Sequence, residues 1–455
     1  MNTILNYLSQ NESALLKRLF DSLKIPSVST KPEHQPDIAK SAQHTADAMR
    51  DIGLENVAIM PTAGNPVVYG DWLNAPGKPT ILFYGHYDVQ PAEPLDLWET
   101  PAFEPAIRDG YIFARGVSDD KGQFLCHFNA IEAFLKTEGK LPVNVKVIIE
   151  GEEEIGSPNL VPFLKAHREL LKADVAFVSD TTMLSKGNPS ICYSLRGLIY
   201  TQLEVTGANT DLHSGQHGGA VPNPINALGQ IISQLKDNQN RVTVPGFYDD
   251  VVVLSAEQRA AIAALPQDDT AYKKWLGVDA LVGEEGYSSF ERRWFRPTLD
   301  CNGIWGGYMG DGSKTVIPSK AFAKISMRLV ANQKAEALLE AFKKHIQTLT
   351  PAGVTVDIVS FTATDPGIID PTHPAIQAGL TALEQAFDTK AVLHGDGGSI
   401  PIVTDFKTIL GLETVLMGFN HPEDKIHAPN EQFGVANFFG GSRAVAHFLK
   451  LFGDA

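Results

Sequence analysis

The chain has 455 residues, 43% of them hydrophobic and 20% charged, which is enough for two or three domains with their own cores. Its formal net charge of −15 argues against a nucleic-acid partner, which would require a broad basic stripe. No apolar run approaches the ~18 residues that a membrane-spanning helix needs, so no membrane partner is expected either. The three cysteines are widely spaced and form no CxxC pair, which favours a reducing, cytoplasmic compartment over a disulfide framework.

The first part of the chain alternates helical and strand-like patterns, as in a sheet built from βαβ units. Residues 1–20 place apolar positions at helical spacing, which predicts an amphipathic surface helix. A second helix is predicted over residues 123–136. Three apolar runs predict buried strands at residues 80–85, 143–149 and 175–179.

The pattern changes near residue 196. From there, alternating apolar and polar residues predict half-buried strands of an antiparallel sheet, with helices over residues 224–236 and 334–348 between them. The segment 364–367 is a candidate hinge, because helices in the first style follow it. The predicted strands are residues 198–205, 321–330 and 354–360, and the later helices are residues 374–387 and 433–452.

We therefore expect an α/β fold, in which a main domain has a mostly parallel central sheet flanked by helices. A smaller inserted α+β domain interrupts it. The expected boundaries are residues 1–196 and 367–455 for the two parts of the main domain and residues 197–366 for the insertion.

Acidic and histidine side chains stand just past the ends of several predicted strands. In an open α/β sheet the site lies outside the carboxyl ends of the strands, so residues far apart in sequence can converge there. Clustered carboxylates repel each other unless cations hold them together. Histidines mixed with several carboxylates suit zinc, manganese or cobalt rather than calcium or structural zinc. The candidate residues are His86, Asp88, Asp119, Glu153, Glu154, Asp180 and His427.

Each candidate also has a plain structural interpretation. Asp119 and Asp180 could be helix caps, and His427 could be a surface or core histidine. The glutamate run at residues 152–154 could be a solvated stretch after a strand. The His86-x-Asp88 pair could arise by chance, although a carboxylate two residues on can hold the second ring nitrogen of a ligating histidine. Their joint occurrence at strand ends favours a two-metal site.

Four sequence stretches carry distinctive motifs: GHYDV at residues 85–89, ARGVSDDKG at 114–122, EGEEEIGS at 150–157 and IHAPNE at 426–431. Together they resemble the motifs of the dinuclear zinc exopeptidases and deacylases. This family includes carnosine-type dipeptidases, glutamate carboxypeptidases, succinyl-diaminopimelate desuccinylase and acetylornithine deacetylase. Residues 293–299 and 303–318 resemble the carnosine-dipeptidase branch in particular.

The resemblance implies two divalent metal ions, with zinc expected and manganese or cobalt as alternatives. It also implies a cis peptide bond after the bridging aspartate, between Asp119 and Asp120. Asp88 would orient a ligating histidine. The implied ligands are His86 and Asp180 on one metal and Glu154 and His427 on the other, with Asp119 bridging both.

Two of the implied assignments depend on register. Glu152 stands beside Glu153, and the pattern Glu-Glu-x-Gly-Ser at residues 153–157 selects Glu153 as the general base. His421 competes with His427 for the last ligand position. The Asn-Glu pair that follows His427 selects His427.

The resemblance gives the inserted domain the part of a lid and a dimerisation domain. His213, in a Gly-flanked loop, would stabilise the oxyanion in the active site of the neighbouring subunit of a homodimer, although it could also be an ordinary turn histidine. Arg328 would bind the substrate carboxylate with its planar fork, unless it forms a surface salt bridge. Ser399, in a Gly-rich turn, and Thr315 would line the same substrate pocket.

The implied function is metal-dependent hydrolysis of dipeptides with a free C-terminal carboxylate, through a water shared by the two metals. One alternative is an N-acyl amino acid deacylase of the acetylornithine or succinyl-diaminopimelate type. The other is a catalytically silent metal-binding scaffold, which should lack the base or some ligands, whereas every expected position is filled here. The sequence contains neither an HExxH nor a GxSxG motif.

Overall fold

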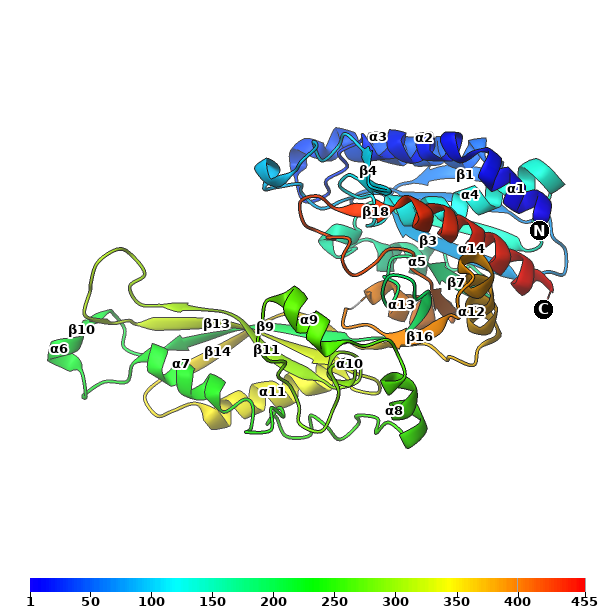
Figure 1. Cartoon of the computed structure of the whole chain (residues 1–455). Helices are drawn as coiled ribbons and strands as arrows, with labels where there is room; N and C mark the ends of the chain where they lie inside the picture. Colours follow the sequence, from blue (N-terminus) through cyan, green and yellow to red (C-terminus); the bar gives the residue numbers. More distant parts are fainter. Residues whose placement is uncertain (399, 455) are drawn as a thin grey trace. The chain divides into compact units, whose positions relative to one another are not determined.

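A computed structural model describes residues 1–398 and 400–454 (Figure 1). The chain forms two compact units. The first unit contains residues 1–193, 369–394 and 405–454, and the second contains residues 194–368 and 395–404.

In the first unit, the central sheet runs in the order β1-β2-β6-β3-β7-β17-β8, and β16 also pairs with β8. Its centre, β6-β3-β7-β17, is parallel. On either side of this centre, β2 and β8 pair antiparallel to their neighbours. The strands are β1 (Glu55–Met60), β2 (Val67–Trp72), β3 (Thr80–His86), β6 (Asn144–Glu150), β7 (Val175–Val178), β8 (Ser190–Leu195), β16 (Val392–Gly395) and β17 (Glu413–Leu416).

Helices flank this sheet (Figure 1). The predicted helix over residues 1–20 is two helices, which are separated at Asn11. Helix α4 is buried along most of its length and packs against β3 and α14. Gly139 caps its end with a φ of 68°, which suits a residue without a Cβ. The helices are α1 (Asn2–Gln10), α2 (Glu12–Leu23), α3 (Gln35–Asp51), α4 (Lys121–Glu138), α5 (Leu160–Ala166), α12 (Pro374–Phe387) and α14 (Val435–Asp454).

Short elements complete the first unit. A small antiparallel sheet has the order β18-β5-β4. Its strands are β4 (Ala106–Arg108), β5 (Tyr111–Phe113) and β18 (Gln432–Gly434), and the short helical turns are Pro32–His34, Leu95–Leu97, Glu153–Ile155 and the π-helical Phe406–Leu410.

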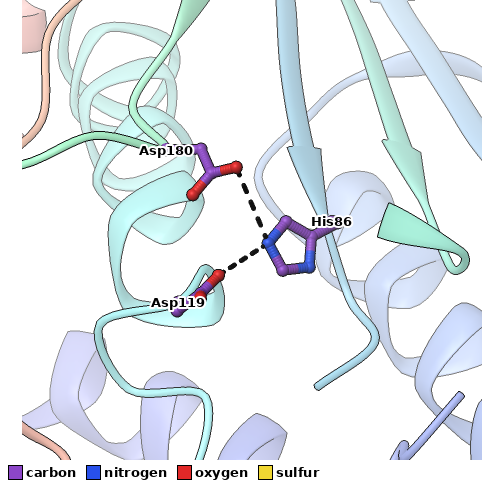
Figure 2. Close-up of side chains that lie close together, drawn as sticks. All are labelled: His86, Asp119 and Asp180. Atoms are coloured by element: carbon purple, nitrogen blue, oxygen red, sulfur yellow. Dashed lines mark hydrogen bonds and ion pairs between the residues drawn. The ribbon is translucent and has the colours of Figure 1, made fainter. Parts of the chain in front are cut away.

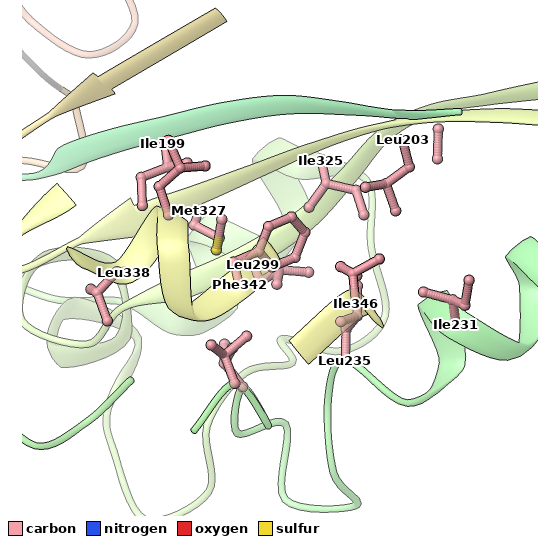
Figure 3. Close-up of a cluster of buried hydrophobic side chains, with 14 of the residues drawn as sticks. Ile199, Leu203, Ile231, Leu235, Leu299, Ile325, Met327, Leu338, Phe342 and Ile346 are labelled. Atoms are coloured by element: carbon pink, nitrogen blue, oxygen red, sulfur yellow. The ribbon is translucent and has the colours of Figure 1, made fainter. Parts of the chain in front are cut away.

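The second unit is built on an antiparallel sheet of order β11-β13-β9-β14. Residues of β9 and β13 alternate between buried and half-buried, because one face of each strand packs on the core. Figure 3 shows this core, in which Ile199 and Met327 of the sheet pack with Phe342 of α11. The strands are β9 (Gly197–Thr206), β11 (Thr298–Gly306), β13 (Lys320–Leu329) and β14 (Thr355–Thr364).

The remaining elements of the second unit are short, apart from α7 and α11, which supply the other side of the core. Strand β10 pairs with β12, and β15 pairs with the end of β8. These elements are β10 (Leu212–His213), α6 (Ser214–His217), α7 (Pro224–Ser233), α8 (Ala256–Ala263), α9 (Asp269–Leu276), α10 (Ser289–Trp294), β12 (Val316–Ile317), α11 (Ala335–Leu349), β15 (Gly367–Ile368) and α13 (Pro401–Asp405).

Residues 395–404 group with the second unit, although the sequence pattern assigned them to the main domain. The backbone N–H of Arg196 donates to the carbonyl of Gly398 at 2.9 Å, and its Nε donates to that of Gly397 at 3.0 Å. These bonds attach the turn to the start of β9.

The predicted α/β class, with a central sheet flanked by helices, is confirmed. The parallel pairing that was expected for most of the sheet is limited to its central strands. Within the described part of the chain, no helix combines the length and the apolar character needed to cross a membrane.

Candidate two-metal site

Parallel strands bring the candidate residues to one edge of the central sheet. Strand β3 ends at His86, which pairs in register with Glu150 at the end of β6. On the other side of β3, Tyr84 pairs with Val178, the last residue of β7, and Asp180 follows two residues later. The local order of an apolar strand followed by a polar end therefore places these side chains next to each other.

The first group of possible ligands consists of His86, Asp119 and Asp180 (Figure 2). The Nε2 atom of His86 lies 2.9 Å from Oδ1 of Asp119 and 3.9 Å from Oδ2 of Asp180. One donor atom from each residue lies within 4.8 Å of the other two. His86 is fully buried, so this end of the group is removed from water.

The second group consists of Asp119, Glu154 and His427. The Nε2 atom of His427 lies 2.8 Å from Oδ2 of Asp119 and 3.2 Å from Oε2 of Glu154. Asp119 belongs to both groups and turns one carboxylate oxygen toward each histidine. A carboxylate that bridges two cations needs this arrangement.

The electrostatics of the cluster fit two divalent cations. Burial and then the charge of Asp119 raise the pKa of Asp180 to about 7. Hydrogen bonds to Asp119 and Glu154 raise the pKa of His427 to about 10. Although burial disfavours its charged form, hydrogen bonds to Asp119 and Asp88 raise the pKa of His86. The cluster thus retains protons to limit carboxylate repulsion, and cations bound to oxygen and nitrogen donors would replace them.

Asp88 contacts residues of both groups of possible ligands. The Nδ1 atom of His86 lies 3.0 Å from the backbone carbonyl of Asp88 and 3.4 Å from its carboxylate. The same carboxylate accepts the backbone N–H groups of Glu153 at 3.2 Å and Glu154 at 3.1 Å. Asp88 therefore connects the imidazole of His86 to the glutamate turn, whereas the sequence indicated only an effect on His86.

Glu152 and Glu153 have different environments. The Glu152 carboxylate is buried and accepts hydrogen bonds from the backbone of Asn65 at 2.9 Å and from the side chain of Asn159. Burial raises the pKa of Glu153, and the nearby charges of Asp180 and other carboxylates raise it further, although His86 opposes them. Glu153 therefore belongs to the electrostatic environment of the cluster, and Glu152 is held in a structural network.

His421 and His427, the two candidates for the last ligand position, also differ in environment. His421 is buried, and its Nε2 lies 3.1 Å from the side-chain amide of Asn437. His427 is half exposed and contacts Asp119 and Glu154. Only His427 of these two is in a group of possible metal ligands among the described residues.

The peptide bond between Asp119 and Asp120 is cis, which confirms the expectation of a cis bond at this position.

Glu431 is a positioning residue that the sequence used only as a marker of register. Its buried carboxylate accepts the backbone N–H groups of Gly116 at 3.0 Å, Ser118 at 2.9 Å and Asp119 at 3.2 Å. It also pairs with Arg115 at 2.7 Å. One carboxylate thus holds the whole turn that carries the shared aspartate. The signal in the sequence was its place in the IHAPNE stretch, but the donors lie more than 300 residues away.

Three of the remaining candidates, His213, Thr315 and Arg328, lie in the second unit. Strand β10 ends at His213, which pairs with Val316 of β12, and the backbone of Thr315 accepts the N–H of Ser214 at 3.0 Å. These pairings bring His213 and Thr315 together. Arg328 lies toward the other end of β13, on the half-buried face of the strand. Ser399 lies outside the described residues.

The chain belongs to the peptidase family M20/M25/M40, whose family model matches residues 82–451. The Cys-Gly metallodipeptidase dug1 of Schizosaccharomyces pombe is 30% identical over 464 residues, which cover 99% of this chain and 98% of that protein. The Beta-Ala-His dipeptidase of Homo sapiens is 29% identical over 457 residues, covering 97% of this chain and 90% of the human protein.

Solved structures agree with these sequence relatives. The M20 family metallo-carboxypeptidase Sso-CP2 from Sulfolobus solfataricus has a TM-score of 0.86 and 33% identity, with 97% of this chain and 99% of that chain covered. Human carnosine dipeptidase 1 has a TM-score of 0.85 and 28% identity, with 100% and 99% covered. The predicted family, its dipeptidase branch and the metallopeptidase class are therefore confirmed.

Proposed function

We propose that this chain hydrolyses dipeptides that have a free C-terminal carboxylate, at a pair of divalent cations. The observation that carries the proposal is the position of Asp119, whose two carboxylate oxygens lie within 3 Å of two different histidines. The names of the relatives support the substrate class, since they are Cys-Gly and Beta-Ala-His dipeptidases.

The residues that would hold the cations come from both groups. His86 and Asp180 would bind one, Glu154 and His427 the other, and Asp119 both. When bound, such a pair lowers the pKa of a nearby water and polarises a carbonyl. Zinc is our proposed metal because histidine and carboxylate donors together suit it, with manganese and cobalt as alternatives.

Glu153 would act as the general base. It would take a proton from the attacking water and return it to the leaving amine. Burial and the neighbouring carboxylates raise the pKa of Glu153, which favours uptake of a proton by this group and supports the role. Asp88 would keep the backbone of Glu153 and the ring of His86 in place.

The second unit would contribute the substrate contacts. Arg328 would bind the C-terminal carboxylate, and Ser399 would line the pocket around it. Thr315 lies with His213 toward the other end of β13 from Arg328, so it would line that pocket from the other subunit. His213 would stabilise the oxyanion in the other subunit of a homodimer. The pairing of β10 with β12 supports a joint role for His213 and Thr315, because it brings them to the same end of the unit.

A homodimer through this unit is supported by the face of its sheet that is turned away from the core. Trp305 and Phe322 stack there with ring centroids 5.2 Å apart, and Tyr200 and Phe361 contact each other at 5.4 Å. Phe361 is 52% exposed. Half-exposed aromatic side chains on one face are typical of a protein-protein contact.

The exposed thiol of Cys301 supports the proposed cytoplasmic location.

The test is a hydrolysis panel on chelator-treated protein, with zinc, manganese and cobalt added back separately. Cys-Gly, β-Ala-His and Ala-Ala should be cleaved only after metal is restored, while acetylated and succinylated amino acids should not. Preferential cleavage of the acylated amino acids would show that the chain is an N-acyl amino acid deacylase and not a dipeptidase. The likeness to Sso-CP2 makes a carboxypeptidase the second candidate, and cleavage of tetrapeptides as fast as dipeptides would favour it.

A further inference from the structure

The second unit contains a basic pocket outside the candidate two-metal site, beside the edge strand β11. Its volume is about 280 Å³. Five cationic and two acidic side chains are among its lining residues, which is an excess of three positive charges. The formal charge of the whole chain is −15, so this excess is a local departure from the charge of the molecule. The cationic residues are Arg196, Lys236, Arg292, Arg293 and Arg296.

The two acidic lining residues are already engaged. Glu284 is buried and receives two hydrogen bonds of 2.7 Å from Arg296. Asp300 is exposed and lies 3.5 Å from Nζ of Lys236. Two of the five cationic residues, Arg296 and Lys236, therefore lie beside the lining carboxylates.

Two aromatic rings hold Arg293 in place, and among the described residues no carboxylate forms an ion pair with it. Its guanidinium lies 4.9 Å from the ring centroid of Tyr272 and 5.9 Å from that of Phe290. Stacking leaves the edge of a guanidinium available for hydrogen bonds, and that edge matches the two oxygens of a carboxylate. Burial, followed by the charge of Arg328, lowers the pKa of Arg196 to about 10, so the two arginines share one electrostatic environment.

The pocket adjoins the position proposed for the substrate carboxylate. Thr298, which lines the pocket, is the register partner of Arg328 across the β11–β13 ladder. Directly paired residues have Cβ atoms about 5 Å apart on the same face of a sheet. A residue whose backbone carboxylate is bound by Arg328 could therefore reach the basic pocket with its side chain.

We propose that the basic pocket binds a carboxylate, and that its natural ligand is the acidic side chain of the substrate's C-terminal residue. Dipeptides that end in aspartate or glutamate are then the favoured substrates. The binding of a carboxylate stands on the pocket itself, while the assignment to substrate rests on the proposed dipeptidase function.

The experiment compares wild type with Arg293→Glu and with a matched control, Arg241→Glu. Arg241 is exposed, lies 4.5 Å from the ring centroid of Tyr248 and is not among the pocket lining. Both variants change the net charge equally, and both remove cation-π contacts, two in Arg293→Glu and one in Arg241→Glu. Only the first change reverses a charge in the pocket.

The first measurement is the thermal unfolding midpoint against succinate concentration at constant ionic strength. Wild type and Arg241→Glu should show the same saturable rise, and Arg293→Glu should need about tenfold more succinate, as expected for the loss of a charge-assisted contact. The proposal that the pocket binds a carboxylate would be overturned if the unfolding midpoint of wild type showed no saturable rise. An equal loss of succinate affinity in both variants would also overturn it. This measurement needs no hydrolysis, so it remains valid if the proposed function fails.

The second measurement is kcat/KM for Ala-Glu and Ala-Gln. Wild type and Arg241→Glu should prefer Ala-Glu, and Arg293→Glu should lose about tenfold of that preference with Ala-Gln little changed. Equal rates for the two dipeptides in wild type, with saturable succinate binding, would overturn the substrate assignment and identify a free dicarboxylate as the ligand.

Discussion

The carboxylate of Glu431 accepts the backbone N–H of Asp119 at 3.2 Å, across 312 positions of sequence. The same carboxylate binds the N–H groups of Gly116 and Ser118 and pairs with Arg115. Glu431 therefore fixes the turn that carries the shared Asp119. It also lies four positions after His427, which is another member of the cluster. Both sides of the proposed two-metal site depend on this contact.

Glu431→Gln should weaken metal binding by about 10–100-fold, because an amide cannot replace a carboxylate that accepts several N–H groups and an arginine. The measurement is competition for zinc against a chromophoric chelator. Glu423→Gln is the control, since Glu423 is an exposed glutamate in the same loop. Unchanged zinc affinity in Glu431→Gln would show that the turn holds its shape without this carboxylate.

Glu153→Gln should retain both metals and lose about 10²–10⁴-fold in kcat, the usual effect of removing a general base. Metal content and steady-state rates are measured on the same preparation. Glu152→Gln should instead lower the unfolding temperature and leave kcat nearly intact, because Glu152 bonds to Asn65 and Asn159. The reverse pattern would transfer the base role to Glu152.

His127 should make the folded state sensitive to acid. Burial lowers the pKa of His127 from 6.5 to about 3, and the ring packs on Phe83 with its Nε2 2.7 Å from the hydroxyl of Ser179. Below pH 6.5 the unfolded chain binds a proton that the folded chain does not. The stability from the neutral ring is therefore complete above pH 6.5 and is lost as the pH falls toward 3.

The corresponding slope is about 1.4 kcal/mol of unfolding free energy per pH unit for one proton. Urea unfolding between pH 5 and 6 should show that His127→Gln removes most of this slope relative to wild type. His217→Gln, which changes an exposed histidine, should retain it. Parallel pH profiles for all three proteins would mean that His127 is protonated in the folded state.

Arg328→Ala should raise KM for free dipeptides by about tenfold or more, since one charge-assisted bidentate contact is lost. Amidating the C-terminus of the substrate should be nearly as damaging to wild type. The two changes together should cost little more than either one alone, because they remove the same contact. Equal cleavage of free and amidated dipeptides by wild type would exclude the role of Arg328.

Glu153→Ala and His213→Ala should complement each other if His213 acts in the other subunit. Each variant alone should be nearly inactive. After subunit exchange, half of the dimers are mixed and have one intact site of two, so activity should return to about a quarter of wild type. Demonstrated exchange without recovery would place His213 in the site of its own subunit.

Local patterns predicted much of the fold. Strands β3, β6 and β7 are buried on both faces, so they are continuous apolar runs. Strands β9 and β13 are buried on one face, so apolar and polar residues alternate along them. Both patterns can be read from a short stretch of sequence. Helix α12 begins and ends at the predicted residues. Its start was predictable because proline suits the first turn of a helix. The break at Asn11 was missed, since the apolar spacing continues across it.

The sequence by itself determined which residue types are available for a metal site and at which strand ends they stand. Only the tertiary structure decided that Glu152 faces Asn65 and Asn159, that His421 contacts Asn437, and that Glu431 holds the turn of Asp119. It also decided that residues 395–404 attach to Arg196. The physical reason is that a buried polar group must find its hydrogen-bonding partner in space, and that partner can lie anywhere in the chain.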